Sequence, residues 1–257
     1  MPSSLLLICF SISIIINILW IFATITVVTM KGGWPWLRDR ISILLNGRES
    51  RNSIYALNRI SVFDQLPVHS EDIVFLGDSI LNYGEWHEYL DNVRAKNRAI
   101  DGDDTHSILG RLAAVVAGNP RHIIVSCGIN NLQRKMTTSQ TIHEYNQILS
   151  YILLQSPNST VWILPVLPVN AKLYALRIAS QFPGVSRPRN SDVDTINSFL
   201  ESLAADTSRV HYVDMPELLS DMGELRDKYT IDGLHLNGRG LRKIALRLQQ
   251  SGIGEGQ

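Results

Sequence analysis

The segment with the clearest potential for chemistry is an apolar run, Ile73–Leu76, that ends on Gly77-Asp78-Ser79. A serine placed where a strand ends is displayed at the carboxyl edge of a sheet, and open α/β sheets bind their ligands at that edge. The serine hydroxyl is a weak nucleophile until a neighbouring base takes its proton. Alone, Gly-Asp-Ser is also an ordinary turn sequence. Ser79 is therefore a candidate nucleophile that needs partners from elsewhere in the chain.

Suitable partners occur far downstream, in Asp232-Gly233-Leu234-His235. A carboxylate that accepts one ring proton of a histidine fixes the tautomer of the imidazole and stabilises its protonated form. By itself, an Asp-x-x-His sequence ahead of a helix is also a common capping arrangement. Together with Ser79 at another strand end, however, Asp232 and His235 supply an orienting acid and a base. The combination predicts a serine hydrolase.

Acyl transfer also needs hydrogen-bond donors that point at the oxygen on which negative charge develops. The backbone N–H of Gly102 has no side chain to block it, and Asn130 offers a side-chain amide just beyond another expected strand. With the N–H of Ser79 they make three candidate oxyanion donors. Taken singly, Gly102 and Asn130 are ordinary turn residues. Losing one such donor typically lowers turnover about 100- to 1000-fold.

Short apolar segments alternate with longer segments of helical periodicity, and these elements must position the site. The expected strands are Ile73–Leu76, Val93–Asn97, Ile123–Cys127, Val161–Leu164 and Val210–Val213. The expected helices are Thr105–Ala117, Thr138–Gln155, Asp192–Ala205 and Gly238–Gln249. This alternation predicts a five-stranded parallel sheet covered on both faces, a three-layer α/β domain. The loops that follow the strands of such a domain share one edge, so the candidate residues are expected to converge there.

In order and spacing, these motifs resemble the four sequence blocks of the GDSL/SGNH hydrolase family. The matching segments are Gly77–Ser79, Gly102, Gly128–Asn130 and Asp232–His235. The resemblance covers roughly Ser53–Ser251, nearly everything after the apolar amino end. It is strongest to the branch described as platelet-activating-factor acetylhydrolase-like or sialate O-acetylesterase-like. That similarity lies in Ile73–Trp86, Asn97–Thr105 and Thr230–Asn237.

The resemblance implies both a fold and a mechanism. The fold is a flavodoxin-like sheet, and the reaction is ester hydrolysis through an acyl-serine intermediate, with no metal or organic cofactor. Ser79 is then the nucleophile, His235 the base and Asp232 its partner. The oxyanion donors are Ser79, Gly102 and Asn130.

Two positions depart from the family pattern. The third block usually ends in Asn-Asp and here ends in Asn130-Asn131, which keeps the size and one acceptor but loses the charge. In the second block, where relatives often read Gly-x-Gly-Gly, Ala99 and Asp101 replace two glycines. An Asp101 side chain that pointed inward would repel anionic substrates.

The amino end differs in character from the rest of the chain. No charged side chain occurs from Met1 through Met30, and Leu5–Val28 is almost wholly apolar. About 20 apolar residues span a bilayer core, and the segment lacks the basic start and small-x-small exit of a cleaved signal peptide. We therefore expect a transmembrane anchor at 1–30, a linker at 31–52 and an SGNH hydrolase domain at 53–257.

The residues after this span bear on orientation and on the connection to the domain. Basic residues follow the span and none precede it: Lys31, Arg38, Arg40, Arg48 and Arg51. The positive-inside rule places the hydrolase domain in the cytoplasm, whereas family habit favours an exported enzyme, so the side stays open. Helical spacing predicts two short amphipathic helices, the second docked on the domain. Their apolar residues are Ile41, Leu44 and Leu45, then Ile54, Leu57 and Ile60.

Composition limits the remaining classes of function. A chain of 257 residues with 45% hydrophobic content supports one sizeable α/β core. Its formal net charge of +0 and the lack of a basic patch argue against nucleic acid as a partner. The two cysteines, Cys9 and Cys127, provide neither a disulfide framework nor a cysteine-based metal site.

The sequence therefore predicts a membrane-anchored serine esterase that removes small acyl groups, with acetyl the expected group. The expected substrate is a small ester, such as an acylated carbohydrate or a lipid-like molecule. Two alternatives remain. One is an O-acyltransferase that uses the same triad, and the other is a non-catalytic glycan-binding module on the same scaffold. Retention of all four blocks argues against the binding module, because binding alone requires no nucleophile, base and oxyanion donors.

Overall fold

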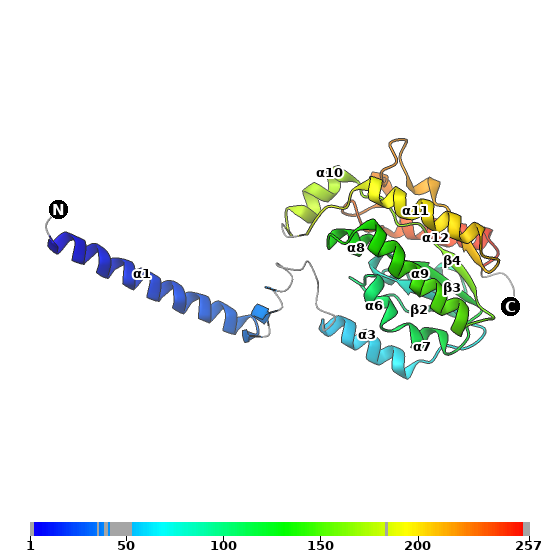
Figure 1. The fold of residues 1–257 in the computed structure, drawn as a ribbon, viewed down its shortest axis with the longest axis horizontal. Coiled ribbons are helices and arrows are strands. Elements are labelled where there is room, and N and C mark those ends of the chain that lie inside the picture. Colours follow the sequence, from blue (N-terminus) through cyan, green and yellow to red (C-terminus); the bar gives the residue numbers. More distant parts are fainter. Residues whose placement is uncertain (1–2, 35, 39–40, 42–52, 183–184, 254–257) are drawn as a thin grey trace. The chain divides into compact units, whose positions relative to one another are not determined.

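The computed structural model describes residues 3–34, 36–38, 41, 53–182 and 185–253 (Figure 1). The chain forms two compact units, Met1–Ser50 and Arg51–Gln257. Of the apolar residues that predict the first short helix, Leu44 and Leu45 lie outside the described residues.

The first unit contains helix α1, Ser3–Met30. Its segment Ile8–Met30 has a mean hydropathy of 2.4 and none of it is buried, so by length and composition it could cross a membrane. A signal sequence near an amino terminus has the same properties. Three threonine hydroxyls, of Thr24, Thr26 and Thr29, donate to carbonyls four residues earlier. Their polar groups are therefore satisfied within the helix, as an apolar environment requires.

The second unit is built on the five-stranded parallel sheet that the sequence predicts. Its strands are β1 Ile73–Gly77, β2 Ala95–Asn97, β3 His122–Ser126, β4 Thr160–Ile163 and β5 Val210–Tyr212. They lie in the order β2-β1-β3-β4-β5, and every neighbouring pair is parallel. The chain leaves β1 for β2 on one side and then crosses to β3 on the other. The strand order therefore reverses between β1 and β3, the place where open α/β sheets bind ligands.

Helices flank the sheet. The shorter ones are α3 Ile54–Gln65, α4 Ser79–Asn82, α5 Trp86–Tyr89, α6 Thr105–Leu109, α7 Leu112–Val116, α8 Ile129–Gln133 and α10 Ala171–Tyr174. The longer ones are α9 Thr138–Gln155, α11 Asn190–Ala205 and α12 Gly238–Gln250. A π-helical turn, Ala175–Ala179, extends α10, and 3₁₀ turns cover Pro216–Leu218 and Asp227–Tyr229.

Two buried apolar clusters lie on opposite faces of the sheet and complete the three layers. Side chains alternate between the faces of a strand, so Val74 and Leu76 of β1 join one cluster while Ile73 and Phe75 join the other. The first cluster includes residues of α6, α7, α8, α9, α10 and α11, and the second includes residues of α4, α5 and α12. Figure 1 shows α9 and α11 lying along the strands. The three-layer prediction is confirmed.

The helix expected over Thr105–Ala117 is divided into α6 and α7. The backbone of Arg111 leaves the helical conformation, with φ −125° and ψ 6°. Its guanidinium reaches inward to Asp103 and to the carbonyl of Gly77. A buried ion pair therefore interrupts a segment whose apolar periodicity is continuous.

Helix α3 follows the expected position of the second amphipathic helix, but its contacts differ from the expected face. Ala56 is buried, and Arg59 donates to the carbonyl of Asn97. Ile54 and Leu57, which define the expected apolar face, are 88% and 51% exposed. The helix is attached by the buried Ala56, by the ring of Phe63 against Arg98 and by hydrogen bonds, most of which the apolar spacing does not reveal.

Candidate active site

Ser79 lies at the point where β1 gives way to α4. Gly77 ends the strand, and a Cβ there would lie 2.1 Å from the carbonyl oxygen of Ser126 on β3, so only glycine fits. Asp78 then caps α4 by accepting a hydrogen bond from the N–H of Ile80 at 3.0 Å. Ser79 therefore begins α4 at the carboxyl ends of β1 and β3, and it is 3% exposed.

Asp232 and His235 form a hydrogen-bonded pair in the loop before α12. Nδ1 of His235 lies 2.7 Å from Oδ2 of Asp232. The other carboxylate oxygen accepts the backbone N–H groups of Leu234 and His235 at 2.9 and 2.8 Å. The hydroxyl of Thr230 donates to the carbonyl of His235 at 2.7 Å. Because Nδ1 faces the carboxylate, Nε2 is the ring nitrogen left to exchange a proton with another group.

The charges near this pair shift its pKa values in opposite directions. Burial would lower the pKa of His235, but the hydrogen bond and charge of Asp232, together with the charges of Asp101 and Asp78, raise it above 6.5. Burial would raise the pKa of Asp232, yet hydrogen bonds from His235 hold it below its ordinary value. Burial also raises the pKa of Asp78 to about 7. The imidazole is thus more basic than usual beside an ionised carboxylate.

His235 and Ser79 lie on adjacent segments, but no direct hydrogen bond joins their side chains. The ring of Tyr83, one helical turn after Ser79, lies 5.5 Å from the imidazole, centroid to centroid. Among the described residues, no hydrogen bond joins the Ser79 hydroxyl to His235. Catalytic hydrogen bonds are often long in free enzymes and shorten when substrate binds. The structure thus brings the candidate nucleophile and the candidate base close together. A movement of their side chains would be enough to form the hydrogen bond between them.

Gly102 and Asn130 are also brought together. Gly102 has φ +78°, a conformation that favours glycine, in the loop after β2. Asn130 lies in the first turn of α8, and its side-chain amide donates to the carbonyl of Asp103 at 2.9 Å. One of its two amide hydrogens is thereby used, and the other is available to a ligand. The amide therefore lies against the loop that carries Gly102.

Two buried ion pairs, which the motifs do not reveal, hold this loop. Arg111 pairs with Asp103 at 2.7 Å, and Arg134 pairs with Asp104 at 2.8 Å. All four side chains are at most 10% exposed. Arg134 also donates to the carbonyl of Gly102 at 2.6 Å. The sequence signal available was the run Asp103-Asp104, which shows neither that Arg111 and Arg134 pair with it nor that the charges are buried.

The departure at Asn131 has a structural explanation. Its side-chain oxygen accepts the N–H of Thr105 at 3.1 Å, and its amide donates to the Thr105 hydroxyl at 2.5 Å. The Thr105 hydroxyl in turn donates to Glu144. A carboxylate at position 131 would compete with Glu144 for that single hydroxyl hydrogen. Asn131 therefore suits the acidic neighbour that this chain carries on α9.

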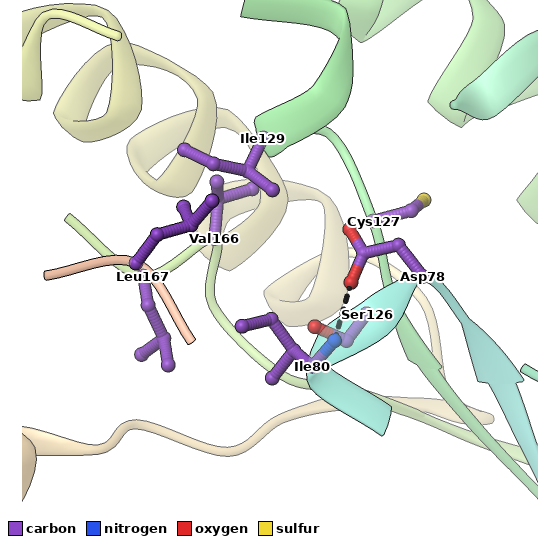
Figure 2. Close-up of a pocket in the computed structure, with 8 residues that line it drawn as sticks. Asp78, Ile80, Ser126, Cys127, Ile129, Val166 and Leu167 are labelled. Atoms are coloured by element: carbon purple, nitrogen blue, oxygen red, sulfur yellow. Dashed lines mark hydrogen bonds between the residues drawn. The ribbon is translucent and has the colours of Figure 1, made fainter. Parts of the chain in front are cut away.

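A small pocket adjoins the nucleophile segment, and Asp78 and Ile80, the neighbours of Ser79 in sequence, line it (Figure 2). Its other lining residues are Ser126, Cys127, Ile129, Val166, Leu167 and Leu234. It has room for about one water-sized group. Burial raises the pKa of the Cys127 thiol, which keeps this sulfur protonated and unreactive. In the described part of the chain, no three His, Cys, Asp or Glu side chains are placed to hold a metal ion.

Comparisons with solved structures agree on the fold. A structure from Streptococcus pneumonia that is named after platelet activating factor has a TM-score of 0.66 and 24% identity, covering 77% of this chain and 92% of that one. A GDSL-like lipase from Bacteroides thetaiotaomicron has a TM-score of 0.62 and 17% identity, covering 76% and 95%. A carbohydrate esterase family 3 protein from Talaromyces cellulolyticus has a TM-score of 0.52 and 15% identity, covering 72% and 97%.

Comparison at the level of sequence families is more specific. No curated protein matches the chain. Residues 75–243, however, match the model of the GDSL-like Lipase/Acylhydrolase family, and this match covers well over half of the chain. The resemblance that the four sequence blocks indicate is thereby confirmed. The chain belongs to the GDSL-like lipase/acylhydrolase family and is a carboxylic-ester hydrolase.

Proposed function

We propose that this protein is a serine esterase in which Ser79 attacks the ester carbonyl and His235 acts as its base. The observation that carries the proposal is the 2.7 Å pair of Asp232 and His235 beside the segment that presents Ser79. Asp232 keeps the hydrogen on Nδ1, which leaves Nε2 to accept the serine proton. The raised pKa of His235 strengthens it as a base.

The reaction proceeds in two halves. The oxygen of Ser79 bonds to the carbonyl carbon while its proton passes to Nε2 of His235. The negative charge that develops on the carbonyl oxygen is stabilised by the N–H groups of Ser79 and Gly102 and by the amide of Asn130. The alcohol then leaves with the proton held by His235. A water molecule, activated by the same imidazole, attacks the acyl-serine and releases the carboxylic acid.

We also propose that the acyl group is short, with acetyl as the best candidate, and that the alcohol belongs to a carbohydrate or a lipid-like molecule. The pocket that Asp78 and Ile80 line supports a short chain, because it is small and its other walls include Ile129, Val166 and Leu167. Figure 2 shows Ile129, Val166 and Leu167 together on one side of the pocket, with Asp78 and Cys127 on the other. The segment Ile8–Met30, which is long and apolar enough to cross a membrane, supports a membrane anchor.

A fluorophosphonate probe, which labels activated serines, tests the nucleophile on the full chain in detergent. We expect labelling of the wild-type protein, no labelling of Ser79→Ala, and retained labelling of Ser156→Ala. Ser156 is the matched control because it is a buried serine at the end of α9, before β4 begins and so at the opposite edge of the sheet. Release of acid from 4-nitrophenyl acetate, followed by loss of activity with longer acyl chains, completes the test.

Each other outcome contradicts a distinct part of the proposal. Labelling that persists in Ser79→Ala would assign the nucleophile elsewhere. A folded wild-type protein that is not labelled would contradict catalysis by an activated serine. Labelling without acid release, but with transfer of the acyl group to an added alcohol, would identify an acyltransferase.

A further inference from the structure

An aromatic side chain forms part of the rim of the site. Tyr83 follows α4, and its N–H donates to the carbonyl of Ser79 at 3.2 Å. Its ring is tilted by 53° to the imidazole of His235, with the centroids 5.5 Å apart. Tyr83 is 45% exposed, so one side of the ring faces solvent. Tyr83 therefore lies at the solvent-exposed side of the site, next to His235.

An acidic side chain is fixed to the same rim. The hydroxyl of Tyr83 donates to Oδ2 of Asp101 at 3.1 Å. Asp101 immediately precedes Gly102, and the preceding residue, Ile100, is tied to the end of β1 by a 3.0 Å bond to the carbonyl of Gly77. The carboxylate of Asp101 thus lies between the Gly102 loop and the nucleophile segment. Its negative charge also contributes to the raised pKa of His235.

The two arginines that contact the Gly102 loop already form ion pairs with other carboxylates. Arg111 pairs with Asp103 and Arg134 with Asp104, both in buried contacts. No salt bridge in the described part of the chain involves Asp101, whose hydrogen bond comes from a neutral hydroxyl. Among the described residues, the rim therefore carries a negative charge that no salt bridge neutralises.

We propose that Asp101, held in place by Tyr83, is a specificity-determining residue that selects against esters whose alcohol portion is anionic. The inference rests on the proposed function. In that mechanism His235 gives its proton to the departing alcohol, so the alcohol portion lies on the side of His235, where Tyr83 and Asp101 also lie. The preferred substrates are esters of neutral or cationic alcohols, such as uncharged polyols.

The expected size of the effect follows from Coulomb's law. Two like charges about 6 Å apart repel each other enough to change a rate roughly 3-fold at the dielectric constant of water and roughly 100-fold at an effective value near 20. The site is partly open, so we expect a discrimination between these limits. Salt should reduce it, because the Debye length falls to about 3 Å at 1 M ionic strength.

Three aryl acetates of similar shape test the proposal. They are 4-acetoxybenzoate, which is anionic, 4-acetoxybenzamide, which is neutral, and 4-(trimethylammonio)phenyl acetate, which is cationic. For the full chain in detergent at pH 8.5, each kcat/KM is divided by the rate of hydrolysis by hydroxide. The ratio of anionic to neutral substrate removes effects common to both, including any change in the basicity of His235.

We expect Asp101→Asn to raise the anionic-to-neutral ratio about 3- to 100-fold and to lower the cationic-to-neutral ratio. Tyr83→Phe, which keeps the ring but frees the carboxylate, should shift the anionic-to-neutral ratio less. Asp206→Asn is the matched control. It removes the exposed carboxylate of the residue that follows α11, just before β5 begins and so at the opposite edge of the sheet. Its ratios should equal those of the wild type.

The outcomes separate this inference from the proposed function. If Asp101→Asn changes all three rates by one factor, or none of them, Asp101 does not select by charge and the inference is overturned. If Asp206→Asn shifts the ratios as much as Asp101→Asn, the effect belongs to the overall charge and the inference again fails. If the wild type hydrolyses none of the three esters and resists the fluorophosphonate probe, the proposed function fails and the inference falls with it.

Discussion

Gly233 offers a sharp test of how closely the loop of Asp232 and His235 is fixed. It has φ +91°, and a Cβ added there would lie 2.5 Å from the backbone nitrogen of Tyr174 and 2.7 Å from the carbonyl oxygen of Asn170. The carbonyl of Gly233 also accepts the N–H of Asn170 at 2.8 Å. Gly233→Ala must therefore push two backbone segments apart at the centre of the loop that carries Asp232 and His235.

Gly223 is the matched control, because it also has positive φ, +73°, but nothing lies within 4 Å of an added Cβ. Gly223→Ala should carry only the backbone cost of a left-handed L-residue, about 1–2 kcal/mol. Gly233→Ala carries that cost and a contact about 0.9 Å shorter than the 3.4 Å at which ordinary contacts begin. Its total destabilisation should reach about 3 kcal/mol or more, the range of severe packing defects.

Thermal unfolding followed by circular dichroism measures both variants. For a unit of this size about 1 kcal/mol lowers Tm by roughly 2–4 °C, so Gly223→Ala should lose a few degrees and Gly233→Ala two or three times as much. A displacement near 1 Å at the reacting groups costs on the order of 100-fold in rate. At a temperature below the Tm of both variants, we therefore expect kcat of Gly233→Ala to be about 100-fold lower than that of the wild type. We expect kcat of Gly223→Ala to stay within 2-fold of the wild-type value. Equal Tm values and equal rates for the two variants would refute the close contact.

Two further predictions concern charge. The rate kcat/KM for a neutral ester should fall as pH drops through the pKa of His235, since the protonated imidazole cannot accept the serine proton, and this midpoint should lie above 6.5. Asp232→Asn should move the midpoint to lower pH, because the charge that raises it is removed; a midpoint at or below 6.5 in the wild type, or one unmoved in the variant, would contradict the pairing. Asn131→Asp should lower the stability at pH 8 by about 3 kcal/mol, because a buried carboxylate would face Glu144 across the Thr105 hydroxyl. Adding Glu144→Gln should recover most of the lost Tm, and a double variant as unstable as the single one would disprove the competition.

The sequence predicts the sheet well because its strands are short, apolar and buried on both faces. Residues 73–77 of β1 are all buried, and such runs stand out from the amphipathic helices between them. The end of each run also marks the place where a loop begins. That is why Ser79, Gly102 and Asn130 can be assigned to one edge before any coordinate is known.

The elements that the sequence does not predict are determined by contacts distant along the chain. The break between α6 and α7 depends on Arg111, whose partner carbonyl belongs to Gly77, 34 residues earlier. The short α10 and its π-helical turn, Ala175–Ala179, follow Asn170, which caps α10 and bonds to Asp227, 57 residues later. Periodicity reports which face of an element is apolar and carries no information about such pairs.

In the candidate site, too, some residues are predictable from the sequence and others depend on distant contacts. Residue types that perform chemistry are recognisable in sequence, because few side chains can act as nucleophile, base or oxyanion donor, and their order along the strands limits where they can meet. The residues that determine specificity are not restricted to a few side-chain types, so their type alone does not identify them. Asp101 was visible as an acidic replacement for glycine, but its direction depends on the hydroxyl of Tyr83, which contacts it at 3.1 Å from another loop. Asn131 was visible as the loss of a charge, but only its contact with Thr105, which bonds to Glu144, shows why a neutral side chain is required. A departure from a family pattern therefore becomes interpretable only when the partner that accommodates it is known, and in this chain both partners come from other segments of the fold.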